Sequence, residues 1–161
     1  MRRSKPSAAR AVDEPACRRA ALELLARREH SRRELTRKLT ARGFPDEVIG
    51  PALDELERSG ALADARFTDS FVRSRIAKGQ GPQRIRAQLA QRGIADLEAD
   101  DGLRTADVDW LATIRAVRAK RFGAQLPRDY AERARQARFL QYRGFDSAQI
   151  RAALEFDPDS D

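Results

Sequence analysis

The chain has 161 residues, and its 32 Lys and Arg residues outnumber its 25 Asp and Glu residues, which gives a formal net charge of +7. This excess predicts attraction to polyanions such as nucleic acids. A single cysteine, Cys17, excludes an internal disulfide and a cysteine-based zinc site, so we expect no metal and no cofactor. No segment approaches the roughly 18 apolar residues of a membrane span, and no apolar run follows the basic start. These features predict a cytoplasmic protein without a membrane partner.

Residues 1–14 are basic and lack apolar periodicity, which predicts a mobile basic arm. From Cys17 onward, apolar residues recur at helical spacing and predict a first helix. His30, the only histidine, is expected at the end of this helix and partly protonated, because a cation there complements the helix dipole. Ser31 and Glu34 have the spacing of a capping box, in which each side chain accepts from the backbone N–H of the other residue. They predict the start of a second helix.

The second helix is predicted to end at Gly43, because glycine adopts the left-handed backbone conformation without steric cost. Asp46 is then expected to cap a third helix, and Pro51 within it predicts a kink or a delayed start. The Leu-x-x-Arg-Gly motif that ends at Gly43 recurs at intervals of roughly 50 residues, ending at Gly93 and Gly144. Three copies of one helical unit are therefore predicted.

The second and third copies repeat the order of the first. Pro82 predicts a helix start in the second copy, because a first-turn N–H has no partner within the helix. Trp110 is expected in the core of the third copy, where Gln136 replaces an aliphatic residue of the earlier copies. Since no segment alternates like a strand, we predict an all-α fold of three tandem three-helix, helix-turn-helix-like repeats in an elongated, curved array. The expected parts are a basic arm over 1–14, repeats over 15–62, 63–107 and 108–156, and an acidic tail over 157–161.

Charge alternates in phase with the repeats. Residues 27–43 carry seven basic and two acidic groups, whereas residues 44–65 carry one basic and six acidic groups, and the later copies repeat this alternation. Either the charges solvate exposed helix faces, or the basic helices form a surface that follows a polyanion while the acidic segments face another surface. The sequence contains no phosphate-binding loop of the P-loop type, and a single histidine offers little for acid–base catalysis. We therefore do not expect an enzyme.

Segments in all three copies resemble motifs of the RecX family of bacterial RecA regulators. They are LARREHSRRELTRKLTARG at residues 25–43, FVRSRIAKGQGPQRI at residues 71–85, and KRFG at residues 120–123 with FLQYRGF at residues 139–145. The resemblance covers roughly residues 16–156. The chain departs from the family pattern at Gln80, Gln88 and Tyr142, where a bulky, an acidic and a basic residue are common.

The resemblance implies a cytoplasmic regulator that binds the RecA filament on single-stranded DNA and inhibits the recombinase, ATPase and co-protease activities of RecA. Such a protein modulates recombination, DNA repair and the SOS response. It is expected to be a monomer that contacts single-stranded DNA non-specifically, through charge. The residues expected to contact the filament are Arg27, Arg28, Arg32, Arg37, Lys38, Arg73, Arg75, Lys78, Arg84, Arg86, Arg121, Arg138 and Arg143. An alternative for Arg143, as for Arg42 and Arg92, is a structural role at the end of a helix, where arginine complements the dipole.

Two other classes remain open on the sequence alone. A direct DNA-binding protein with helix-turn-helix units, such as a transcriptional repressor, would bind a specific duplex sequence, usually as a dimer. A helical adaptor would use the same charges for protein contacts, and its binding to a partner would survive nuclease treatment.

Overall fold

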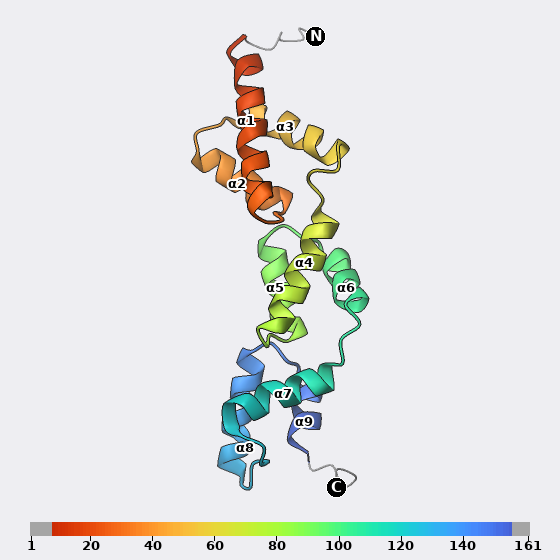
Figure 1. Cartoon of the computed structure of the whole chain (residues 1–161). Helices are drawn as coiled ribbons and strands as arrows, with labels where there is room; N and C mark the ends of the chain where they lie inside the picture. Colours follow the sequence, from red (N-terminus) through yellow and green to blue (C-terminus); the bar gives the residue numbers. More distant parts are fainter. Residues whose placement is uncertain (1–7, 156–161) are drawn as a thin grey trace. The chain divides into compact units, whose positions relative to one another are not determined.

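The structure of the chain is a computed structural model that describes residues 8–155, with side chains from Asp13 onward. Over that range the chain forms nine α-helices and no strand (Figure 1). The helices are α1 (Ala8–Arg27), α2 (Arg32–Ala41), α3 (Asp46–Arg58), α4 (Asp64–Ala77), α5 (Pro82–Gln91), α6 (Asp96–Thr105), α7 (Trp110–Phe122), α8 (Tyr130–Tyr142) and α9 (Ser147–Leu154). The all-α fold and the tandem three-helix repeats are confirmed, whereas the elongated and curved form of the array stays a prediction.

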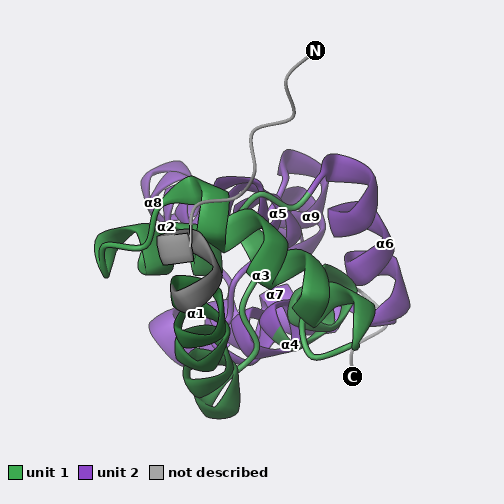
Figure 2. Cartoon of the chain, turned by 90° about the horizontal axis from the view of Figure 1, so that it is seen from above, with its two compact units in different colours: residues 1–70, 92–94 green, residues 71–91, 95–161 purple. Residues whose placement is uncertain are grey.

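The chain divides into two compact units (Figure 2). Unit 1 comprises residues 1–70 and 92–94, and unit 2 comprises residues 71–91 and 95–161. The boundary falls within α4, so the two units do not coincide with three separate repeats. Residues 92–94 belong to unit 1 because the Arg-Gly turn between α5 and α6 contacts the start of α2.

The core of unit 1 is built from the helix faces that the leucine spacing defines. Leu35 and Leu39 lie four residues apart in α2 and are fully buried, together with Leu53 of α3 and Cys17 of α1. Burying one such leucine stabilises the fold by about 1.5–3 kcal/mol. Cys17 is a small, fully buried residue of this core, and its burial, together with the charge of Glu14, raises the pKa of its thiol.

The first helix starts earlier than the sequence predicted. α1 begins at Ala8 and continues through Pro15, so residues 8–14 of the predicted arm are helical. This segment is rich in alanine, the residue with the highest helix propensity, which favours a helix despite the charged residues. The remainder of the predicted arm, residues 1–7, and the predicted tail over 157–161 lie outside the described residues.

The start of α3 also differs from the prediction. Pro45 is the N-cap, with an extended backbone at φ −74° and ψ 153°, and Asp46 is the first helical residue. The prediction that Asp46 caps α3 is therefore wrong, although its carboxylate still complements the dipole in the first turn. Pro51 lies inside α3 and does not delay its start.

Unit 2 has an apolar core of its own among the helices of the third repeat. Ile114 of α7, Leu140 of α8 and Leu154 of α9 are buried together with Phe145. Trp110 packs against this cluster, and its ring meets that of Phe145 edge to face with the centroids 6.4 Å apart. The predicted role of Trp110 in the core of the third repeat is confirmed.

Gln136 replaces an aliphatic residue in the third repeat because it belongs to a buried polar cluster. Gln136 is 2% exposed, donates to the Glu132 carboxylate at 3.0 Å and lies 3.4 Å from the buried Arg118 guanidinium. Arg118 also donates to the backbone carbonyls of Ala124 and Gln125 at 3.1 Å each. The arginine thus holds the long α7–α8 loop against the helices, and Gln136 provides it with a polar neighbour in the core.

Two glycines permit a close approach between backbone segments within unit 2. Gly81 N donates to the carbonyl of Arg143 at 2.8 Å, and Gln83 N donates to that of Gly144 at 3.0 Å. A Cβ atom on Gly81 would lie 2.5 Å from the Gly144 backbone. Pro82 begins α5 beside this contact, as predicted. The α4–α5 turn is thereby fixed to the α8–α9 turn.

Candidate nucleic-acid interface

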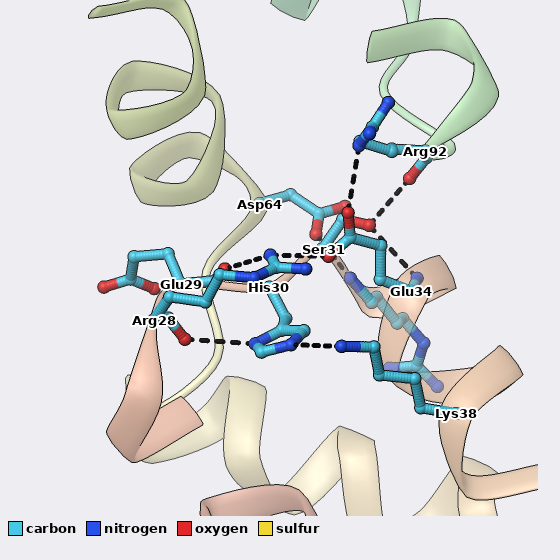
Figure 3. A network of polar contacts seen from close by, with 9 residues as sticks. Arg28, Glu29, His30, Ser31, Glu34, Lys38, Asp64 and Arg92 are labelled. Carbon is cyan, nitrogen blue, oxygen red and sulfur yellow. Dashed lines mark hydrogen bonds and ion pairs between the residues drawn. The ribbon is translucent and has the colours of Figure 1, made fainter. Parts of the chain in front are cut away.

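A polar network surrounds the turn between α1 and α2 in unit 1 (Figure 3). His30 lies at its centre and is only 2% exposed. Its Nδ1 lies 3.0 Å from the carbonyl oxygen of Arg28, and its Nε2 lies 3.0 Å from Lys38 Nζ. Since a carbonyl can only accept, Nδ1 carries the proton, and Nε2 accepts from the lysine ammonium. His30 therefore connects the end of α1 to α2 as a neutral imidazole.

The expectation of a partly protonated His30 at the end of the first helix is wrong. α1 ends at Arg27, and His30 lies beyond it in the turn. Burial lowers the pKa of His30, and the nearby charges of Arg28 and Lys38 lower it further. Protonating Nε2 would place an N–H against the Lys38 ammonium. The histidine is thus a structural bridge that holds the candidate cation Lys38.

Ser31 and Glu34 form only half of the predicted capping box. Ser31 Oγ accepts from Glu34 N at 3.1 Å and donates to the Arg92 carbonyl at 2.7 Å. The Glu34 carboxylate instead forms ion pairs with Arg28 at 2.9 Å and with Arg92 at 3.1 Å. Glu34 is only 12% exposed, so its carboxylate is partly dehydrated and attracts the two guanidinium groups more strongly than it would in water.

Arg32 is also engaged by carboxylates of unit 1. Its guanidinium lies 2.8 Å from Asp54 and 3.0 Å from Glu57, both on α3. Partial burial acts to lower the pKa of Arg32, but the hydrogen bonds and charges of Glu57 and Asp54 raise it. The backbone N–H of Arg32 donates to Asp64 at 2.8 Å. The acidic third helix therefore neutralises part of the basic second helix of the same repeat.

A cleft of about 560 Å³ in unit 2 gathers three of the predicted cations. Lys78 lies just after α4, Arg121 near the end of α7, and Arg143 at the end of α8. Lys120 lines the same cleft and was missed by the sequence analysis, although its position next to Arg121 was a usable signal. The full lining is Ile76, Ala77, Lys78, Gly79, Thr113, Ala116, Val117, Lys120, Arg121, Phe139 and Arg143, with no carboxylate among them.

Phe139 orders two of the cleft's guanidinium groups. Those of Arg143 and Arg121 lie 5.2 and 5.8 Å from the centre of its ring, distances at which the ring attracts a cation. Arg143 also donates to the Lys78 carbonyl at 3.1 Å. Arg143 therefore has a structural contact outside its own helix, and it remains part of the cleft lining.

The other predicted cations are spread over both units. Arg84 lies 5.0 Å from the centre of the Tyr142 ring and donates to the Tyr142 carbonyl at 3.3 Å. Arg86 pairs with Asp100 at 2.6 Å, and Arg75 lies 4.6 Å from the centre of the Phe71 ring. Exposed members of the predicted set are Arg27, Arg28, Arg37, Arg73, Lys78, Arg86, Arg121 and Arg138, and half-buried members are Arg32, Lys38, Arg75, Arg84 and Arg143. The members of the set thus differ in exposure and in their contacts with carboxylates and aromatic rings.

Other kinds of site receive no support from residues 8–155. No group of three or more His, Cys, Asp or Glu side chains in that part of the chain is arranged to hold a metal ion. None of the described helices is both long and apolar enough to cross a bilayer.

The helices and their order define a tandem three-helix-repeat protein with a basic surface cleft. Sequence models of the first, second and third three-helix domains of RecX match residues 17–56, 64–103 and 107–154. The chain therefore belongs to the RecX family of regulatory proteins. It is 55% identical over 138 residues to the regulatory protein RecX of Halorhodospira halophila, covering 86% of each chain. It is 51% identical over 140 residues to the one of Pseudomonas entomophila, covering 86% of this chain and 90% of that one.

Solved structures of RecX proteins have the same fold. The crystal structure of RecX from Lactobacillus salivarius superposes with a TM-score of 0.75 at 23% identity, covering 89% of this chain and 95% of that one. A second crystal structure of regulatory protein RecX gives a TM-score of 0.77 at 22% identity, covering 95% of this chain and 80% of that one. The arrangement of helices is therefore retained at low sequence identity.

Proposed function

We propose that this chain binds the RecA filament on single-stranded DNA and inhibits the recombinase, ATPase and co-protease activities of RecA. The observation that carries the proposal is its membership of the RecX family across all three domains. A cleft with four cations and no carboxylate supports a nucleoprotein target, because phosphates dominate the affinity of proteins for nucleic acids. The protein acts in the cytoplasm, as a monomer, and without a catalytic activity of its own.

The cations of the predicted set contribute unequally to this function. Arg28 and Arg32 already pair with carboxylates of unit 1. A phosphate must therefore compete with Glu34 for Arg28, and with Asp54 and Glu57 for Arg32. The side-chain ammonium groups of Lys78 and Lys120 form no hydrogen bond or ion pair with other described residues, and both residues are exposed in the cleft. The cleft of unit 2 is therefore the main contact with the filament.

The proposal is tested by the steady-state ATPase rate of RecA on single-stranded DNA while this protein is titrated in. We expect inhibition at far fewer copies than RecA subunits, which would indicate action on filament growth or disassembly. Inhibition only near equal stoichiometry would indicate coating of the filament. Unchanged ATPase activity with tight binding to bare DNA would contradict the proposal and favour a direct DNA-binding protein.

A further inference from the structure

The cleft of unit 2 has two chemically different parts. Lys78, Lys120, Arg121 and Arg143 give it four positive charges from segments that are far apart in the sequence. The rest of the lining is largely apolar, with side chains such as that of Val117. A ligand that uses both parts must combine an anionic group with an apolar surface.

The volume of the cleft suits a small ligand group. Its size of about 560 Å³ falls within the roughly 300–1,000 Å³ typical of sites for small molecules and cofactors. Another hollow in the same unit, of about 520 Å³, differs in charge because Asp146 lines it together with Arg133 and Arg151. Of these two hollows, the cleft lined by Lys78, Lys120, Arg121 and Arg143 is thus better suited to an anion.

The two arginines of the cleft are positioned before any ligand arrives. Arg143 is held by the Lys78 carbonyl and by the Phe139 ring, and Arg121 lies close to the rings of Phe139 and Phe122. A guanidinium plane can stack on a nucleobase, and its N–H groups can bind a phosphate in a bidentate manner. Ordering these groups in advance reduces the entropy lost on binding.

We propose that this cleft binds one nucleotide, with its phosphate on the cations and its base against the apolar wall formed by Ile76, Val117 and Phe139. The inference rests on the proposed function and deepens it, since it assigns the contact with nucleic acid to a pocket for a single unstacked base. The same chemistry has two sources, a nucleotide within single-stranded DNA and a free nucleoside triphosphate. The test distinguishes the two.

The phosphate half of the proposal is tested with Lys120→Gln and the matched control Arg115→Gln. Both residues are exposed on α7 and both changes remove one positive charge, but only Lys120 lines the cleft. Binding of a fluorescent 15-residue oligothymidylate is measured by anisotropy over a range of salt concentrations. We expect Lys120→Gln to weaken binding several-fold and to lower the log–log salt slope by about 0.7, the value for one phosphate contact on a single strand. Equal effects of the two changes would overturn the proposal.

The base half is tested with Ala116→Trp and the matched control Ala112→Trp. Both alanines are exposed on α7, and only Ala116 lines the cleft, so the bulky ring fills the apolar part without a change of charge. We expect the parent protein to prefer oligothymidylate to an abasic strand of equal length, and Ala116→Trp alone to abolish this preference. If both tryptophan variants bind the two strands like the parent protein, no base enters the cleft and the proposal fails.

Two competitors identify the source of the ligand. If ATP displaces oligothymidylate from the parent protein and from Arg115→Gln but not from Lys120→Gln, the cleft is assigned to a free nucleotide. If millimolar ATP displaces no oligothymidylate, the cleft is assigned to a nucleotide within the strand. If polyglutamate of matched charge displaces the labelled strand as effectively as unlabelled oligothymidylate does, the cleft is a site for acidic peptides and the proposal is overturned. If the RecA ATPase is inhibited while the cleft variants bind oligothymidylate like their controls, this inference fails and the proposed function stands.

Discussion

The turn between α1 and α2 in unit 1 and the cleft of unit 2 are both rich in cations, but they differ in what surrounds those cations. At the turn, Glu34 pairs with Arg28 and Arg92, and the buried His30 accepts from Lys38. In the cleft, Phe139 and a backbone carbonyl order the arginines, and no carboxylate lines the walls. The same basic composition therefore stabilises the fold in unit 1 and leaves positive charge available in unit 2.

The largest effect on stability is expected at Gly144, which ends the Leu-x-x-Arg-Gly motif of the third repeat as Gly43 ends that of the first. Gly144 has φ +99°, and a Cβ there would lie 2.6 Å from Arg84 N, whereas Gly43 has φ +92° with nothing within 4 Å of such a Cβ. Gly144→Ala should lower the free energy of unfolding by about 3 kcal/mol, from backbone strain and overpacking together. Gly43→Ala should cost only the strain, about 1–2 kcal/mol. Urea unfolding of both variants checks the difference, and equal costs would contradict the packing role of Gly144.

The second prediction concerns the carboxylate that pairs with cations in unit 1 and has no counterpart in the lining of the unit 2 cleft. Glu34→Gln removes the carboxylate that holds Arg28 and Arg92 in unit 1. The free energy of unfolding should fall by about 1.5–3 kcal/mol, the usual range for hydrogen bonds to charged groups. Binding of oligothymidylate at low salt should strengthen, because Arg28 and Arg92 each lose a carboxylate that competes with phosphate.

The matched control for this change is Glu23→Gln, on the exposed face of α1. Both substitutions remove one negative charge, so any general gain from net charge is shared. If Glu34→Gln strengthens DNA binding no more than the control does, Glu34 does not limit the binding of DNA by Arg28 and Arg92.

The third prediction concerns pH and His30. Its pKa is lowered in the folded state from the ordinary value of 6.5, so the unfolded chain binds a proton first as the pH falls. The contribution of His30 to the free energy of unfolding is constant above about pH 7. It falls as the pH drops below 6.5, until the pH reaches the lowered pKa of the folded state. The loss between pH 7.5 and 5.5, measured by urea unfolding, should be smaller in His30→Gln. An identical pH dependence in the two proteins would show that the imidazole is not held neutral.

The smallest effect is expected at an exposed ion pair of unit 2. Arg86 and Asp100 are 45% and 52% exposed, and such pairs contribute about 0–1 kcal/mol. Arg86→Gln should therefore change the urea midpoint by little, and by no more than Asp100→Asn does. A large loss of stability in either variant would indicate that this pair has a packing role.

Local sequence patterns predicted the fold because its determinants lie within one or two helical turns. Leu35 and Leu39 define a buried face of α2 by their spacing, and a positive φ occurs at Gly43, Gly93 and Gly144, as the repeated motif indicated. One further local signal was overlooked: Asp146 and Gln149 form a complete capping box at α9.

Whether each cation pairs with a carboxylate was not predictable, because the pairing depends on residues distant in the sequence. Arg32 meets Asp54 and Glu57 only when α2 and α3 pack together. Likewise, Lys78 and Arg143 approach each other through the contact between two turns of unit 2. A count of charges along the chain reports the total available charge, whereas tertiary packing decides which groups are neutralised.

The central claim is that the cations of the unit 2 cleft act on the filament. It is tested most directly by the RecA ATPase rate on single-stranded DNA, titrated with the parent protein, Lys120→Glu and Arg115→Glu. Both variants carry the same charge reversal on α7, and only the first changes the cleft. We expect Arg115→Glu to inhibit like the parent protein and Lys120→Glu to require a several-fold higher concentration. Equal inhibition by the two variants would contradict the account.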